Sequence, residues 1–238
     1  MRIVQAIFLT LAACALTGCY TVTRPTIAHV HIGHTTAGWA DTPEKVGLLT
    51  VAERDAETAA ENARKAFQVG RNPDEMKRYV GYVLHAMDPA LESAGPGSGY
   101  GFIRAMEGAT DHVRFAADSA DASKNLKDSI LGLEAAASRI RQGAKVGVAI
   151  CQEIRRTNKP DDLVSLAEEL RSQSDTIVRE TRAWRGLLQD VIARESPPFS
   201  RIERRYLFGL IRLPNGLWQW HPDVDKASNQ SQGTSGYR

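Results

Sequence analysis

Between Leu126 and Ile154, apolar and small residues recur at spacings that alternate between four and three. This heptad pattern predicts a long helix that buries one narrow stripe against a neighbouring helix. A proline and two acidic residues at 160–162 interrupt the pattern, and a second apolar stripe follows from Leu163 to Val191. Two helices of about 32 residues would each be about 50 Å long, and their short connection predicts an antiparallel hairpin.

Three shorter helices are expected before this hairpin. Thr50 and Glu53 have the spacing of a capping box, which predicts a helix from about Val51 to Val69. Asn72 followed by Pro73 predicts a second helix over 73–87, and a third fits 102–117. The glycine-rich segment 93–101 is interpreted as a sharp connection, and the alternative is an anion site formed by its backbone amides. We therefore expect an all-α protein, an antiparallel bundle of four or five helices with a long helical hairpin.

The C-terminal region also has a signal for strands. Asn215-Gly216 is a strong two-residue turn signal and predicts a small β-hairpin after the bundle. Pairing across this turn would place Leu213 opposite Trp218 and Ile211 opposite Trp220. The last residues, 226–238, are rich in Ser, Gln and Gly, and we expect them to be disordered.

A basic segment lies between the bundle and the predicted hairpin. Residues 199–205 are expected to add a helical turn, and they alternate apolar residues with Arg201, Arg204 and Arg205. With Trp218 and Trp220, these arginines are candidates for a surface that contacts a partner or anionic lipid headgroups. The alternative is that the apolar residues pack on the bundle and the arginines are solvated.

The N-terminus has the features of a secretory signal. Arg2 precedes a short apolar stretch, which ends in Leu16-Thr17-Gly18-Cys19. This sequence resembles the lipobox of bacterial lipoproteins. The resemblance implies that Cys19 becomes the mature N-terminus and carries diacylglycerol and an acyl chain, which would anchor the protein to a membrane. Tyr20 in place of an aspartate favours the periplasmic face of the outer membrane; the alternative to the lipobox is an ordinary signal peptide with a chance cysteine.

Net charge and cysteine content narrow the kinds of partner and of thiol chemistry that we expect for this protein. A net charge of +2 on 238 residues gives no strong field, so we expect no nucleic-acid partner. Of the 3 cysteines, one is removed with the signal and one would be lipidated. Cys151 lies on the heptad stripe and is interpreted as a core thiol. The expected organisation is a signal peptide (1–18), a tether (19–41), a helical domain (42–195), a C-terminal extension with a hairpin (196–225) and a tail (226–238).

Histidines are the main candidates for chemistry. His29, His31 and His34 fall within six residues of the tether, out of 6 histidines in the chain. In an extended segment, His29 and His31 would point to one side, and a turn at Gly33 could bring His34 to them. Imidazoles suit Zn, Cu and haem iron, so a metal site is one interpretation, and packing against the bundle is the other.

The string His31-Ile32-Gly33-His34 also matches the HIGH motif of class I aminoacyl-tRNA synthetases. We reject that interpretation because the chain shows no βαβ pattern. His85 and His112 lie on predicted helices, too far apart by helical rise to share one ion unless the connecting loop changes their register. Either could join the histidines of the tether if that segment lies along the bundle.

These features predict a lipid-anchored periplasmic protein, and they favour a non-enzymatic role. The first hypothesis is an interaction or accessory protein of the cell envelope, with an envelope protein or a second copy of the chain as partner. The second is a metal-binding lipoprotein that uses His29, His31 and His34. A lipid-anchored hydrolase is third, and it would require His85 or His112 to meet an acid in a cleft.

Overall fold

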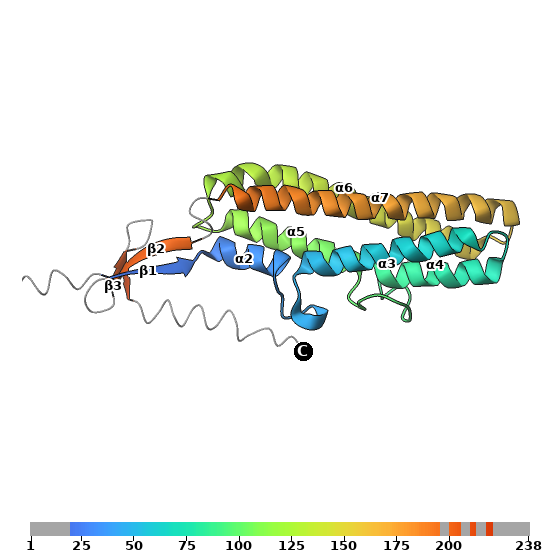
Figure 1. Ribbon diagram of the computed structural model, residues 1–238, viewed down its shortest axis with the longest axis horizontal. Coiled ribbons are helices and arrows are strands. Elements are labelled where there is room, and N and C mark those ends of the chain that lie inside the picture. The colour runs from blue at the N-terminus through green and yellow to red at the C-terminus, as the bar shows by residue number, and fades with distance from the viewer. Residues whose placement is uncertain (1–19, 196–199, 206–209, 213–217, 221–238) are drawn as a thin grey trace, which may run out of the picture. The chain divides into compact units, whose positions relative to one another are not determined.

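The computed structural model describes residues 20–195, 200–205, 210–212 and 218–220 (Figure 1). The chain divides into two compact units. One unit comprises residues 27–198 and is helical, and the other includes the described strands. No described helix combines the length and the apolar composition needed to cross a membrane.

The prediction of a mostly helical protein is confirmed. The helices of the described residues are α2 (Ile27–Thr36), a short 3-10 helix (Pro43–Lys45), α3 (Leu48–Gln68), α4 (Pro73–Met87), α5 (Phe102–Asp118), α6 (Lys124–Arg156) and α7 (Pro160–Ala193). The last five lie close to the expected ranges. Helix α2 was not expected, because residues 27–36 fall in the segment interpreted as an extended tether.

Helices α6 and α7 are the longest and run side by side (Figure 1). Their contacts are antiparallel: Trp184 donates to the carbonyl of Leu133 at 2.9 Å, and Gln173 donates to the carbonyl of Gly143 at 3.1 Å. Most of the predicted stripe of α6 is buried, from Leu126 to Ile154. At Gly143, an added Cβ would lie 2.8 Å from the Gln173 side-chain nitrogen of α7.

The N-termini of α3 and α4 differ in how well the sequence predicts them. Asn72 caps α4 as expected, and its side chain accepts from the Glu75 amide at 3.2 Å. The capping box at Thr50 is wrong, because α3 begins at Leu48, three residues earlier than expected, and Gly47 is its N-cap. A Cβ at Gly47 would lie 2.6 Å from the carbonyl carbon of Thr36, so only glycine fits where the end of α2 meets α3. Glu53 instead accepts from Arg185 of α7 at 2.5 and 2.6 Å.

The strand unit corrects a second expectation. Residues 199–205 were expected to be helical, but Ser200–Arg205 is strand β2, which pairs antiparallel with β1 (Tyr20–Pro25). The pairing supplies the reason: β2 pairs with β1, from Tyr20↔Arg205 to Pro25↔Ser200, and no local pattern reveals a partner so far along the chain.

Strands β3 (Leu210–Arg212) and β4 (Trp218–Trp220) are also antiparallel neighbours. Ile211 lies opposite Gln219, so the predicted pairing of Ile211 with Trp220 is wrong by one residue. The turn at Asn215-Gly216, the tail from 226 and the signal with Cys19 lie outside the described residues, so these expectations stay predictions.

Trp184 offers a test of the packing between α6 and α7. It is 1% exposed, and its indole N–H donates across the helix pair. Trp184→Phe removes this donor and part of the ring, and we expect the free energy of unfolding in urea to fall by about 1–3 kcal/mol.

Leu131→Ala is the matched control on α6. Leu131 is 76% exposed, so its loss should change the free energy of unfolding by less than about 0.5 kcal/mol. Equal stability of Trp184→Phe and wild type would contradict a packing role for the indole.

Candidate metal site

Helix α2 places two of the three clustered histidines on one face. His31 and His34 are three residues apart, and residues at that spacing are neighbours on a helix. His29 is two positions from His31 and is exposed. The expected pairing of His29 with His31 in an extended chain is therefore corrected, because helical geometry selects His34 instead.

A distant carboxylate stabilises α2. Asp121 accepts from the amides of Ile27 at 2.8 Å and Ala28 at 3.2 Å, so it satisfies donors that a helix N-terminus leaves unpaired. Ala28, Ile32 and Thr35 are the buried residues of this helix. Asp121 lies 94 and 93 positions after Ile27 and Ala28, which explains why the local sequence did not predict a helix.

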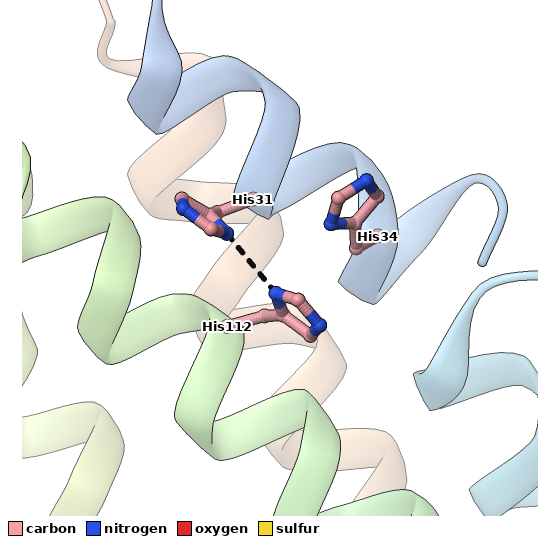
Figure 2. A group of neighbouring side chains, drawn as sticks. All are labelled: His31, His34 and His112. Carbon is pink, nitrogen blue, oxygen red and sulfur yellow. Dashed lines mark hydrogen bonds between the residues drawn. The ribbon is translucent and has the colours of Figure 1, made fainter. Parts of the chain in front are cut away.

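His112 of α5 completes the cluster. Its Nδ1 lies 3.1 Å from Nδ1 of His31, and one potential ligand atom from each of His31, His34 and His112 lies within 4.8 Å of the others. Figure 2 shows the three rings between α2 and α5, with one ring nitrogen of His34 facing the other two. The Thr35 hydroxyl donates to the carbonyl of Ala109 at 3.3 Å, which holds α2 against α5 one turn before His112. We call these three residues the His cluster.

The hydrogen bonding of the His cluster is incomplete. The contact between His31 and His112 requires one Nδ1 to carry a proton and the other to accept it. Nδ1 of His34 is buried and has no hydrogen-bond partner within the described part of the chain. A buried nitrogen of this kind costs free energy unless another group or a ligand contacts it.

Burial also keeps the cluster uncharged. It lowers the pKa of His31, against the opposing charge of Asp121, and it lowers the pKa of His34, with help from His31. For His112, burial and the neighbouring His34 and His31 lower the pKa to about 4. At neutral pH all three imidazoles are therefore neutral, the form that binds metal ions.

Two aromatic side chains flank the cluster. The Trp39 ring centroid lies 4.3 Å from that of His34 and 4.7 Å from that of His112. Phe115 lies 5.6 Å from His31 and 5.9 Å from His112. Trp39 was within five residues of His34 in the sequence, and a large aromatic beside clustered histidines was the signal that could have identified it.

The backbone of Trp39 is fixed by the loop that follows α2. Its amide donates to the carbonyl of Val46 at 3.2 Å, and its carbonyl accepts from the amide of Thr42 at 3.2 Å. The Thr42 hydroxyl, which is buried, also lies 2.8 Å from the Trp39 carbonyl. These contacts fix the backbone of Trp39 at its amide and at its carbonyl, and so position the residue whose indole lies against the cluster.

The other residues predicted to form a site are not part of the His cluster. His85 is buried on α4, and its Nδ1 lies 2.8 Å from the carbonyl of Glu92, so it is not part of the cluster. Cys151 is buried in α6, and burial raises the pKa of its thiol to about 12, as a core thiol requires. Residues of strands β2 and β4 carry the predicted partner surface (Arg201, Arg204, Arg205, Trp218 and Trp220), and that surface stays a prediction.

The glycine-rich loop binds an anion that belongs to the protein itself. The carboxylate of Asp55, on α3, accepts from the Ser98 amide at 2.7 Å, the Ser98 hydroxyl at 2.5 Å and the Gly101 amide at 3.2 Å. Gly101 has a φ of 90°, which glycine adopts readily. The loop is therefore a structural connection, and its amides are used to satisfy a fully buried carboxylate that the sequence analysis missed.

Comparison of the chain with protein families, with curated proteins and with solved structures finds no match.

Asp55 gives a prediction on stability. Asp55→Ala would leave buried loop donors without their acceptor, and we expect the free energy of unfolding to fall by about 2–4 kcal/mol. Asp55→Asn keeps the shape and one acceptor, so its loss should be smaller. Urea denaturation at neutral pH checks both values, and an alanine variant as stable as wild type would contradict the assigned role.

Comparison of wild type with Asp55→Asn also tests the pKa of Asp55. Burial raises this pKa, although the hydrogen bonds from Ser98 and Gly101 oppose the change. The folded state therefore keeps a proton at pH values where the unfolded chain has lost it. Relative to Asp55→Asn, wild type should lose stability as pH rises from about 4 through the folded pKa.

Proposed function

We propose that the protein binds one transition-metal ion through His31, His34 and His112. The observation that carries the proposal is the convergence of three imidazoles from two helices that are far apart in the sequence, with their potential ligand atoms within 4.8 Å of one another. Imidazole nitrogen is a ligand for zinc, copper and nickel. In this proposal His112 is the third ligand, in place of His29, which was predicted from the sequence.

A bound metal ion would offset the free-energy cost of a buried imidazole nitrogen that packing alone leaves without a partner. A buried polar atom without a partner costs about 1–3 kcal/mol, and Nδ1 of His34 is such an atom among the described residues. A histidine retained for packing alone is expected to find a hydrogen-bond partner, as His85 does with Glu92. The donor set also suits an ion better than haem, because haem iron takes at most two axial ligands from the protein.

The ion would be held in a lipid-anchored protein of the periplasm. This part of the proposal is supported by the lipobox sequence ending at Cys19 and by its resemblance to bacterial lipoprotein signals. Metal binding is compatible with the expected accessory role in the envelope, in which the protein would act without catalysis. An envelope partner or a homo-oligomer stays a prediction, which sedimentation of the purified protein with and without envelope extract would test.

The metal proposal is tested on protein purified without a histidine tag. We expect one equivalent of Zn(II) or copper to bind, and His31→Ala, His34→Ala and His112→Ala each to weaken binding by at least about 100-fold. Because the ligands come from α2 and α5 of the folded protein, the ion should also stabilise wild type by about 2.7 kcal/mol at 100 times its dissociation constant.

His29→Ala is the matched control. His29 is on the same helix but is exposed and outside the cluster, so this variant should bind the ion as wild type does. A protein that binds no ion, or whose affinity falls equally in His29→Ala and His34→Ala, would overturn the proposal.

The anchor has a separate test. Cys19→Ser removes the thiol that would be lipidated, and we expect the variant to leave the membrane fraction when expressed with its own signal. Metabolic labelling with a palmitate analogue should mark wild type and not the variant. Labelling of neither protein would contradict the lipobox interpretation and leave the metal proposal unaffected.

A further inference from the structure

The His cluster offers few ligands. Within the described residues, the group that could hold a metal has three members, all histidines, and no carboxylate or thiolate belongs to it. Zinc in proteins is almost always bound by four ligands, and a site with three protein ligands completes its coordination with water. Monovalent copper, by contrast, forms stable complexes with two or three ligands and does not require water.

The surroundings of the cluster are poor in donors for a fourth ligand. The rings of Trp39 and Phe115 lie against the imidazoles, and neither ring offers a metal a lone pair on oxygen, sulfur or nitrogen. The guanidinium of Arg114 lies over the Phe115 ring at 5.6 Å from its centroid. The two rings therefore border the cluster with surfaces that offer a metal no further ligand atom.

The charge of the site favours an ion of low charge. Three neutral imidazoles cancel none of the charge of a bound ion. The carboxylate of Asp121 interacts with His31, but its oxygens already accept from the first amides of α2. Asp111, next to His112 in the chain, is paired with Arg114 at 2.8 Å. Because removing an ion from water costs more free energy the higher its charge, a site with neutral ligands favours a monovalent ion over a divalent one.

Building on the proposed metal function, we propose that the ion of the His cluster is Cu(I), bound by three imidazoles, with Trp39 as the side chain that excludes a fourth ligand. Trp39 is a positioning residue in this proposal, since it shapes the site without donating to the metal. The loop from Trp39 to Val46, with its hydrogen bonds to Thr42, is what holds the indole in that place.

The test compares the two ions on the full mature protein under anaerobic conditions. Cu(I) is supplied as such and titrated against a coloured Cu(I) chelator, and Zn(II) is titrated against a coloured zinc chelator. We expect one equivalent of Cu(I) with an affinity at least about 100-fold above that for Zn(II). X-ray absorption of the copper-loaded protein should show three nitrogen ligands and no oxygen ligand.

The outcomes separate the two proposals. If neither ion binds, the proposed metal function fails, and the choice of ion fails with it. If Zn(II) binds through the His cluster as tightly as Cu(I), or if the bound copper carries a water ligand, metal binding stands and the assignment of Cu(I) is overturned.

Substitution of Trp39 tests the exclusion of the fourth ligand. Trp39→Ala should admit water, lower the preference for Cu(I) over Zn(II) by about 10-fold or more, and add an oxygen ligand to the absorption spectrum. Trp39→Phe keeps an aromatic wall and should preserve most of the preference. Circular dichroism establishes that both variants are folded, and an unchanged preference in folded Trp39→Ala would overturn the role of the indole.

Discussion

The candidate site depends on the contact between Asp121 and the first turn of α2. The carboxylate accepts from the amides of Ile27 and Ala28 and so stabilises a helix whose own sequence has no helical pattern. Once α2 is helical, His31 and His34 share a face, and that face meets His112 on α5. The cluster therefore follows from a tertiary contact, and it would not exist if residues 27–36 were the extended tether that their composition suggests.

The sequence predicts those elements that are determined by local signals, and it does not predict those that depend on partners distant in the chain. The alternating spacing from Leu126 to Ile154 and the Asn72 cap are local signals, and both long helices and α4 lie where these signals place them. The strand formed by 200–205 and the helix formed by 27–36 depend on partners far along the chain. For the site, the residue type was predictable and the set was not: His34 and His112 come together only through the packing of α2 on α5.

Asp55 and His34 show two different ways in which a buried polar group of the helical unit can be satisfied. Asp55 is fully buried, and the glycine-rich loop folds around it so that its oxygens receive hydrogen bonds from Ser98 and Gly101. The cost of burial is thereby offset within the chain, which leaves this loop no amides for an external anion at those positions. Nδ1 of His34 has no such neighbour among the described residues, and an external ligand is the simplest way to satisfy it.

On the proposed function, the same ion would satisfy His34 and link α2 to α5. The ligands on α2 and the ligand on α5 converge only in the folded arrangement, so binding free energy would add to the stability of that arrangement. In the further proposal, Trp39 would decide which ion binds, because it would limit the number of ligands at the site. If Trp39 excludes water from the site, three neutral ligands would suit a monovalent ion, which requires neither an anionic ligand nor a bound water. In this proposal, the loop that fixes the backbone of Trp39 would set the choice of ion.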